Sequence, residues 1–267
     1  MIPLHDENPT SRRPVVTIAL IAACCLVYFL VQPSPFASTV DDVLFTFEWA
    51  VIPNELLQQE PQSQCEVARV VTDSFTAQSV CGGPFAEEPF APGKNVLLAV
   101  LVSLFLHGSV LHLAGNMLFL WVFGNNVEDR LGPVPFAVFY VAAGIVATLG
   151  QAAIDVRSGV PLVGASGAVA GVMGAYLVWY PRARVLTLFF VFLVFWFRIP
   201  AAVLLVAWLV LQFFTNPNEG VAWVAHVAGF AFGVVVGLAV GRPRPPVTPW
   251  QPSGWPPPAS PWPAPGA

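Results

Sequence analysis

Few polar side chains interrupt the apolar parts of this sequence, and those that do are of types that carry chemistry: Ser166, His226, His112 and Asn116. A histidine that takes the hydroxyl proton of a serine turns that serine into a nucleophile. His112 and Asn116 are four residues apart, so on a helix they project from one face and can donate to an oxyanion beside the backbone N–H of Ser166. No carboxylate stands near His226 in the sequence, which favours a Ser-His dyad over a triad.

The elements that must position these side chains are long apolar segments. Of the 267 residues, 56% are hydrophobic and only 10% are charged, whereas soluble domains carry roughly a quarter charged residues. A helix needs about 17–25 apolar residues to span a bilayer. Two short apolar stretches, 96–106 and 185–197, are expected to be re-entrant or interfacial elements. The longer segments predict an all-α membrane protein, a bundle of six transmembrane helices at 15–32, 109–127, 134–153, 163–180, 199–214 and 221–240.

The distribution of positive charge tests this topology, because cytoplasmic loops are enriched in arginine and lysine. With six spans and a cytoplasmic N-terminus, the outer side receives only Arg69, Lys94 and Arg157. Counting either short stretch as a further span would move several arginines to the outer side, so six spans with both termini cytoplasmic are preferred. The basic residues on the inner side are then Arg12, Arg13, Arg130, Arg182, Arg184, Arg198, Arg242 and Arg244.

Depth and glycine spacing bring the polar residues together. In this topology all four lie in the outer third of the bilayer, on helices that enter from the outer face. Glycines repeat every three or four residues on the helices of Ser166 and His226, and such repeats let backbones approach closely. Packing alone would explain either repeat, but the pair predicts contact between Ser166 and His226. The glycines are Gly164, Gly167, Gly171 and Gly174 on one helix, and Gly229, Gly233 and Gly237 on the other.

The segments outside the spans carry weaker signals. Residues 1–14 are expected to form a polar cytoplasmic leader. The following apolar run continues through Cys25, which favours a span over a cleaved lipoprotein signal. Residues 33–108 are expected to form a long, membrane-associated outer loop with an insertion. In it, Cys65 and Cys81 are either free thiols or a disulfide, and an extracytoplasmic setting favours the disulfide.

The C-terminal segment has a different composition. The last 26 residues contain 11 prolines, so 241–267 are predicted to be a disordered cytoplasmic tail. A proline-rich ligand for a partner is the alternative. The arginines form no basic stripe, which disfavours nucleic acid as a partner. No cofactor and no metal are expected.

Three motifs resemble those of the rhomboid intramembrane serine proteases. Gly164-Ala165-Ser166-Gly167 is similar to the GxSG signature of that family. Residues 107–116 (HGSVLHLAGN) resemble its second-span motif, and residues 225–233 (AHVAGFAFG) its sixth. Residues 127–132 (VEDRLG) match the turn after the second span, in which Glu128 and Arg130 resemble a pair that pins the turn. The motifs occur in the family's order and spacing.

The resemblance covers about residues 95–240, with residues 1–32 fitting the first span. It implies a protease domain at 15–240 that cuts transmembrane proteins within the cell membrane, in contact with the lipid bilayer. It implies Ser166 as nucleophile, His226 as general base, and His112, Asn116 and the Ser166 N–H as oxyanion donors. His107 is implied to be structural. Ala170 departs from the family, because many members carry there an aromatic side chain that stacks on the catalytic histidine.

Three alternatives compete with this interpretation. His107, His112 and His226 are possible zinc ligands, but the sequence lacks the H-E-x-x-H pattern of membrane metalloproteases. A transporter would favour inverted repeats, and none is evident. A catalytically inactive rhomboid-like protein that binds clients is the remaining alternative, although this chain keeps both the serine and the histidine.

Overall fold

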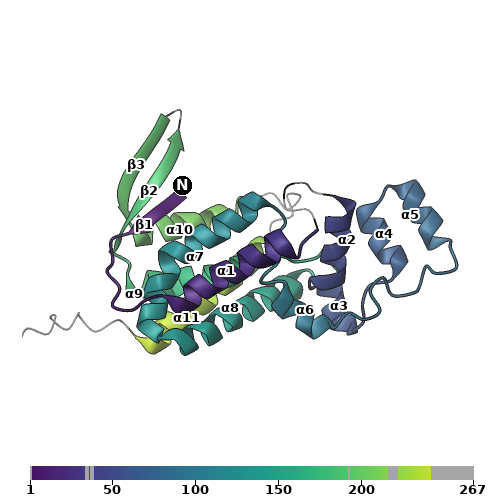
Figure 1. Ribbon diagram of the computed structural model, residues 1–267, viewed down its shortest axis with the longest axis horizontal. Coiled ribbons are helices and arrows are strands. Elements are labelled where there is room, and N and C mark those ends of the chain that lie inside the picture. The colour runs from purple at the N-terminus through teal and green to yellow at the C-terminus, as the bar shows by residue number, and fades with distance from the viewer. Residues whose placement is uncertain (1, 34–35, 37–38, 192, 216–221, 242–267) are drawn as a thin grey trace, which may run out of the picture.

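A computed structural model describes residues 2–33, 36, 39–191, 193–215 and 222–241. It is mostly helical, and a helix lies at each of the six predicted spans. Among the described helices, α7, α8 and α11 are long and apolar enough to cross a membrane, whereas α1, α9 and α10 are shorter apolar helices. Figure 1 shows them side by side in an elongated bundle, with a small sheet at one end and short helices at the other. Their bounds are α1 (Val15–Leu30), α7 (Val110–Leu131), α8 (Pro133–Ile154), α9 (Ser166–Trp179), α10 (Ala201–Gln212) and α11 (Trp223–Val240).

Local sequence explains where these helices begin and end. Ser109 caps α7, because its Oγ accepts the N–H of His112 at 3.1 Å. Gly132 ends α7 with a φ of 85°, a conformation that favours glycine. Pro133 follows at the first position of α8, where its missing N–H costs no hydrogen bond. The α7–α8 turn is therefore tight, and the two helices run antiparallel.

The end of α7 also fixes the start of α1. The Glu128 carboxylate accepts the backbone N–H groups of Val16 and Thr17 at 2.9 and 2.8 Å. These N–H groups belong to the first turn of α1, where no intrahelical acceptor is available and negative charge is favoured. Asp129 accepts from the backbone N–H of Ser11 and Arg12 at 3.1 and 2.9 Å. Two adjacent acidic residues therefore hold the N-terminal segment against the bundle.

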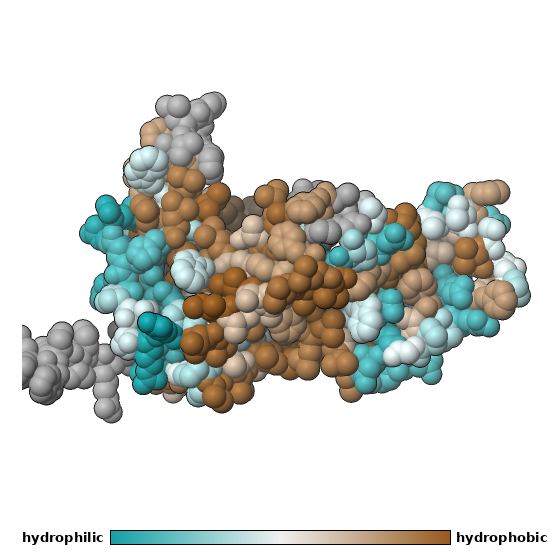
Figure 2. Space-filling model, in the orientation of Figure 1, coloured by the Kyte–Doolittle hydropathy of each residue, from teal (hydrophilic) through white to brown (hydrophobic). Residues whose placement is uncertain are grey.

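Helix α9 lies at the centre of the bundle, with most of its residues buried. It packs against α7, α8 and α11, and α11 packs in turn against α8. The outward surfaces of the bundle carry exposed apolar side chains such as Leu26, Val138 and Leu238. Figure 2 shows this apolar surface as a brown band across the helical body, with hydrophilic residues gathered towards the two ends. Such a band is typical of a protein whose flanks face lipid.

The expectation of an all-α fold is wrong in one region. Strands β1 (Ile2–Asp6), β2 (Arg184–Val191) and β3 (Leu193–Pro200) form an antiparallel sheet in the order β1-β2-β3. The polar leader thus contains a strand, and the stretch 185–197, expected to be a re-entrant or interfacial element, forms most of a β-hairpin. β-Branched and aromatic residues such as those of this stretch favour strands, which hydropathy and charge alone do not reveal.

The leader is also tied to the bundle by a buried carboxylate. Asp6 accepts the hydroxyl of Tyr176 in α9 at 2.7 Å and the side-chain amide of Asn126 in α7 at 2.6 Å. Asp6 is almost fully buried. The N-terminal strand is therefore held by specific hydrogen bonds from its last residue to two of the bundle helices.

The segment 33–108, which was predicted to be a long outer loop, is folded into short helices where the structure describes it. They are α2 (Val40–Trp49), α3 (Pro53–Gln58), α4 (Gln64–Val71), α5 (Ser74–Cys81) and α6 (Val96–Val102). A disulfide joins Cys65 and Cys81, as the outer setting predicted. Several of the acidic residues cap these helices, for example Asp73 on α5 and Glu66 in the capping box of α4. Local capping therefore accounts for part of the acidic composition of this segment.

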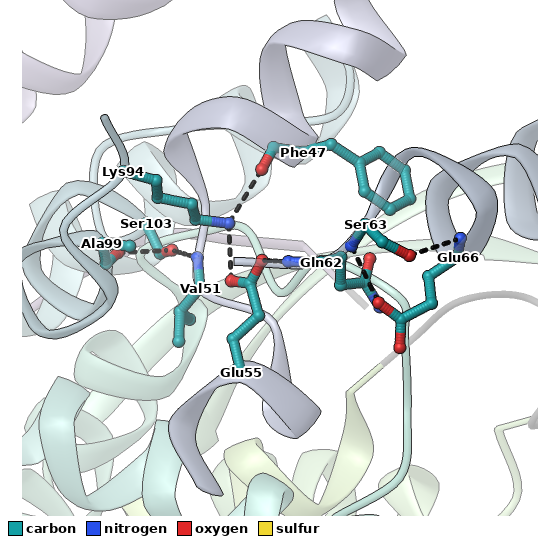
Figure 3. Close-up of polar contacts among 9 residues, drawn as sticks. All are labelled: Phe47, Val51, Glu55, Gln62, Ser63, Glu66, Lys94, Ala99 and Ser103. Atoms are coloured by element: carbon teal, nitrogen blue, oxygen red, sulfur yellow. Dashed lines mark hydrogen bonds and ion pairs between the residues drawn. The ribbon is translucent and has the colours of Figure 1, made fainter. Parts of the chain in front are cut away.

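A buried ion pair links these short helices. The Lys94 ammonium lies 2.7 Å from the Glu55 carboxylate and donates to the backbone carbonyl of Phe47 at 2.8 Å (Figure 3). The other oxygen of Glu55 accepts the Gln62 N–H at 2.9 Å. These bonds join α2, α3 and the segments on both sides of α4 and α5.

Of the predicted C-terminal tail at 241–267, residues 242–267 lie outside the described residues.

Candidate active site

The four residues predicted to carry chemistry line one cavity. His112, Asn116, Ser166 and His226 contribute to the wall of a cavity of about 610 Å³ between α7, α9, α10 and α11. Apolar side chains, among them Phe119, Val169 and Met173, form much of the remaining wall. Residues far apart in the sequence are therefore brought together, as their common depth and the glycine spacing predicted.

Ser166 is the first residue of α9, and the chain before it is held in place. Gly164 has a φ of 122°, which favours glycine, and a Cβ there would lie 2.8 Å from the ring of His112. The Gly164 N–H donates to the Ser103 carbonyl at 2.9 Å, and the Leu162 N–H donates to the Val51 carbonyl at 2.8 Å. Because the first N–H groups of a helix lack intrahelical acceptors, the backbone around Ser166 favours negative charge.

Ser166 and His226 are in direct contact. Ser166 Oγ lies 2.8 Å from His226 Nε2. His226 is in the first turn of α11. Helix α11 packs against α9, and at the glycine positions no side chain separates the two backbones. A Cβ at Gly229 would overlap the Gly167 carbonyl, and one at Gly233 would overlap the Gly171 carbonyl. The small faces therefore set the helix separation that allows the contact.

The other ring nitrogen of His226 has a partner that the sequence analysis missed. His226 Nδ1 lies 2.6 Å from Oε1 of Gln212 at the C-terminal end of α10. Trp208, one turn earlier on α10, lies beside the His226 ring with centroids 5.8 Å apart. The signal was available, since Gln212 is a polar residue in an otherwise apolar helix, and such residues are candidates for function.

Ala170, where many family members carry an aromatic side chain, leaves room for an aromatic neighbour of His226 from another helix. Ala170 is fully buried in α9 and presents no ring to His226. The aromatic contact to His226 comes from Trp208 on a different helix. Trp208 also stacks on Phe230 of α11 and lies near Phe119 of α7. The structure thus supplies an aromatic neighbour for the histidine from α10 in place of α9.

His112 and Asn116 contribute to the cavity wall from α7. The Gly108 N–H points to His112 Nδ1 at 3.4 Å, so Nδ1 acts as acceptor and Nε2 carries the proton. That Nε2 is one of the ring atoms nearest to Gly164. The Asn116 amide donates to the His112 carbonyl at 3.1 Å, which leaves its second N–H for another acceptor. Both side chains present donors to the cavity that Ser166 shares.

His107 lies behind His112 and outside the cavity wall. It is fully buried, and its ring packs edge-on against the His112 ring with centroids 5.2 Å apart. Its Nδ1 lies 3.2 Å from the Phe105 carbonyl, and its backbone N–H and carbonyl bond the side-chain amide of Gln32 in the segment after α1. These contacts fit the structural role that the resemblance implied. Within the described residues no group of three or more His, Cys, Asp or Glu is arranged to hold a metal ion.

Comparison with known proteins adds independent information. Residues 94–243 match the family described as the Rhomboid domain. Presenilin-associated rhomboid-like protein, mitochondrial, from Bos taurus is 35% identical over 101 residues, which are 37% of this chain and 27% of that protein. Rhomboid protease GluP from Bacillus subtilis (strain 168) is 40% identical over 94 residues, covering 33% of this chain and 18% of that protein.

A third relative matches a longer part of the sequence. Rhomboid protein 1, mitochondrial, from Saccharomyces cerevisiae is 28% identical over 156 residues, covering 54% of this chain and 42% of that protein. In each of these comparisons the match spans less than half of the relative's length. The family match covers α7 to α11 and therefore includes every residue of the cavity named above.

Proposed function

This chain belongs to the rhomboid family, and from that premise we propose that it is an intramembrane serine protease, which hydrolyses peptide bonds in or near the transmembrane segments of other membrane proteins. Ser166 is the nucleophile and His226 is the general base. The observation that carries the proposal is the 2.8 Å contact between Ser166 Oγ and His226 Nε2 inside a cavity large enough for a peptide segment. A serine and a histidine at this distance have the geometry of an activated nucleophile.

The reaction follows from this geometry. Ser166 Oγ attacks the substrate carbonyl carbon while His226 Nε2 takes the hydroxyl proton, which gives a tetrahedral intermediate. The peptide C–N bond then breaks, His226 returns the proton to the leaving amine, and an acyl-enzyme remains. Water attacks the ester with His226 again as base. The second product leaves as a carboxylic acid, and Ser166 regains its proton.

The oxyanion of the intermediate is stabilised by donors around Ser166. The backbone N–H of Ser166 at the start of α9, the His112 Nε2–H and the free N–H of Asn116 converge on the cavity. Such donors act strongly because they are fixed before the charge develops and water is largely excluded. The positive end of the α9 dipole adds to this effect.

The proposed topology has six membrane crossings, by α1, α7, α8, α9, α10 and α11, with both termini in the cytoplasm and the protein in the cell membrane. Helix α9 has 14 residues, about 21 Å at 1.5 Å per residue, whereas a bilayer core is about 30 Å thick. If its cytoplasmic end lies at the inner surface, Ser166 lies below the outer surface. The loop before Ser166 can then line a cavity at membrane depth, as irregular backbone in a membrane must.

The substrate class follows from the chemistry of a helix. A transmembrane helix hides its carbonyls in hydrogen bonds, so a peptide must unwind before Ser166 can attack it. We therefore expect single-span proteins whose helix is weakened near the outer face of the membrane. The cavity beside Ser166 would hold the unwound segment.

The test is cleavage of a single-span substrate by the purified protein in liposomes. The wild type should release a defined fragment, and Ser166→Ala or His226→Ala should release none. The double variant should be no worse than either single one, because the two residues act as a unit. Ser79→Ala, an exposed serine of α5, is the matched control and should cleave normally, as should wild type with EDTA. Binding of the substrate without any product from the wild type would instead identify an inactive client-binding relative. Full cleavage by Ser166→Ala would exclude the serine mechanism.

A further inference from the structure

The end of α10 presents a buried amide to the catalytic histidine. The Gln212 residue is only 7% exposed, and its Oε1 lies 2.6 Å from His226 Nδ1. This nitrogen is on the opposite side of the ring from the one that contacts Ser166. The three side chains thus form a continuous line across the His226 ring, from α9 through α11 to α10.

A second hydrogen bond fixes which way the Gln212 amide points. Its Nε2 donates to the backbone carbonyl of Trp208 at 3.0 Å. A carbonyl can only accept, so the nitrogen of the amide must face Trp208 and the oxygen must face His226. A rotated amide would place two acceptors together at Trp208. The orientation of Gln212 is therefore determined by its own helix.

This orientation determines the tautomer of His226. An amide oxygen only accepts, so His226 Nδ1 must carry a proton. In the neutral imidazole Nε2 is then unprotonated and can accept the Ser166 hydroxyl proton, as a general base must. The opposite tautomer would place an N–H against the serine hydroxyl and a lone pair against the Gln212 oxygen.

We propose that Gln212 is a positioning residue for the catalytic histidine: its amide oxygen, held by Trp208, keeps His226 in the tautomer that activates Ser166. The proposal rests on the proposed protease function. Trp208 contributes a second restraint, because its ring lies beside that of His226 at an interplanar angle of 43°. Together these residues of α10 orient the histidine although Ala170 of α9 offers it no aromatic ring.

An amide suits this place better than a carboxylate. A charged side chain inside a membrane is costly unless it is paired. A neutral amide provides the acceptor without that cost. It also gives less stabilisation to the imidazolium that forms during the reaction, because hydrogen bonds to charged acceptors are the stronger ones. The role assigned to Gln212 is thus orientation of the ring rather than charge compensation.

Three variants of the whole chain test whether Gln212 acts through its acceptor oxygen. Gln212→Met keeps the length of the side chain and removes the acceptor, and Gln212→Glu keeps an acceptor oxygen. Leu211→Met is the matched control, because Leu211 is the adjacent residue on α10 and is 51% exposed. The measurements are kcat and KM for a single-span substrate, the labelling rate of Ser166 by a fluorophosphonate, the thermal midpoint in detergent, and ¹⁵N NMR of the histidine rings. His226→Ala identifies the His226 signals by subtraction.

The expected result is a loss of kcat in Gln212→Met of roughly 10- to 100-fold, less than the 10²–10⁴-fold that a general base itself typically contributes, because His226 is still present. KM should be nearly unchanged, because Gln212 is not among the described residues that line the cavity. Labelling should slow in parallel, while Gln212→Glu should be more active than Gln212→Met, and Leu211→Met should match the wild type. The NMR spectrum should show the Nδ1–H tautomer in the wild type and its loss in Gln212→Met.

Two results would overturn the proposal. One is a folded Gln212→Met protein with wild-type kcat or an unchanged His226 tautomer. The other is equal inactivity of Gln212→Met and Gln212→Glu, because the acceptor would then not be what matters. The NMR measurement needs no turnover, so it reports on Gln212 even if Ser166→Ala shows the protease function to be wrong. Conversely, an inactive Ser166→Ala beside a fully active Gln212→Met would remove only the role of Gln212.

Discussion

Gly229 of α11 lies so close to the carbonyl oxygen of Gly167 in α9 that any Cβ at position 229 would overlap it. Gly167 directly follows Ser166, and Gly229 comes three residues after His226. The helix separation that brings the proposed nucleophile and base into contact is therefore the one that these two glycines allow. Packing and chemistry depend on the same place in the structure.

Replacing Gly229 should consequently disturb both helix packing and cleavage. In Gly229→Val the new side chain meets a backbone carbonyl, which cannot move aside, so α9 and α11 must separate. A displacement of about 1 Å can cost on the order of 10²-fold in rate. We expect loss of cleavage together with a lower thermal midpoint in detergent, with activity normalised to folded protein.

Gly237→Val is the matched comparison on α11. A Cβ at Gly237 would lie 2.9 Å from the Val178 Cβ, and Gly237 is about two turns beyond Gly229 and about three turns from His226. This variant should lower stability more than it lowers activity per folded molecule. A Gly229→Val protein that is as active and as stable as the wild type would contradict the close approach of α9 and α11.

The oxyanion donors should affect turnover without affecting the fold. Removal of one such donor typically lowers kcat by about 10²–10³-fold, and we expect this range for Asn116→Ala and for His112→Ala. Labelling of Ser166 by a fluorophosphonate should weaken but persist, because the dyad remains. Asn125→Ala, near the other end of α7, should retain wild-type kcat. Unchanged kcat in both cavity variants would show that neither residue stabilises the intermediate.

The buried ion pair between Lys94 and Glu55 of α3 can be tested by a double-mutant cycle. The Lys94 and Glu55 side chains are only 2% and 1% exposed, and removing one partner of such a pair typically costs about 3–5 kcal/mol because the other charge stays buried. Lys94→Met should therefore strongly destabilise helices α2–α4, measured by their amide hydrogen exchange. Adding Glu55→Gln, which keeps the acceptor for Gln62, should restore much of the loss. Arg69→Met, on the same outer segment, is the control, and simple additivity of the Lys94 and Glu55 changes would argue against coupling.

The docking of β1 should depend on pH through Asp6. Burial raises the pKa of Asp6 above its ordinary value of 3.8, although the Tyr176 hydroxyl opposes the shift. A carboxyl whose pKa is higher in the folded than in the unfolded protein stabilises the fold when the pH is below its unfolded pKa. That contribution is lost as the pH rises through its folded pKa. The quantity to measure is the thermal midpoint of the wild type minus that of Asp6→Asn. This difference should decrease as the pH rises from about 4 to the raised pKa, and it should be constant above that pKa. A difference that grows more favourable to the wild type with rising pH would reverse the assigned sign.

Several parts of this protein follow from the sequence because they depend on local patterns. Hydropathy predicted a helix at each of the six apolar segments, since an apolar run of that length has few alternatives in a membrane. Glycine spacing and common depth predicted that Ser166 would meet His226, and the contact is present. Of the two alternatives for Cys65 and Cys81, the disulfide that an extracytoplasmic setting favours is the one present.

Other parts were decided only by the tertiary structure. The sheet joins residues 2–6 to residues 185–188, and no periodicity within either segment reveals a partner so far along the chain. The same holds for Gln212. The sequence shows that Gln212 is a polar residue in an apolar helix. Which group it contacts depends on the packing of α10 beside α11, where the Nδ1 of His226 lies within hydrogen-bond distance. Composition and spacing determined which residues were available for chemistry, whereas long-range packing decided how the histidine is oriented, because hydrogen bonds need distances that only the assembled helices set.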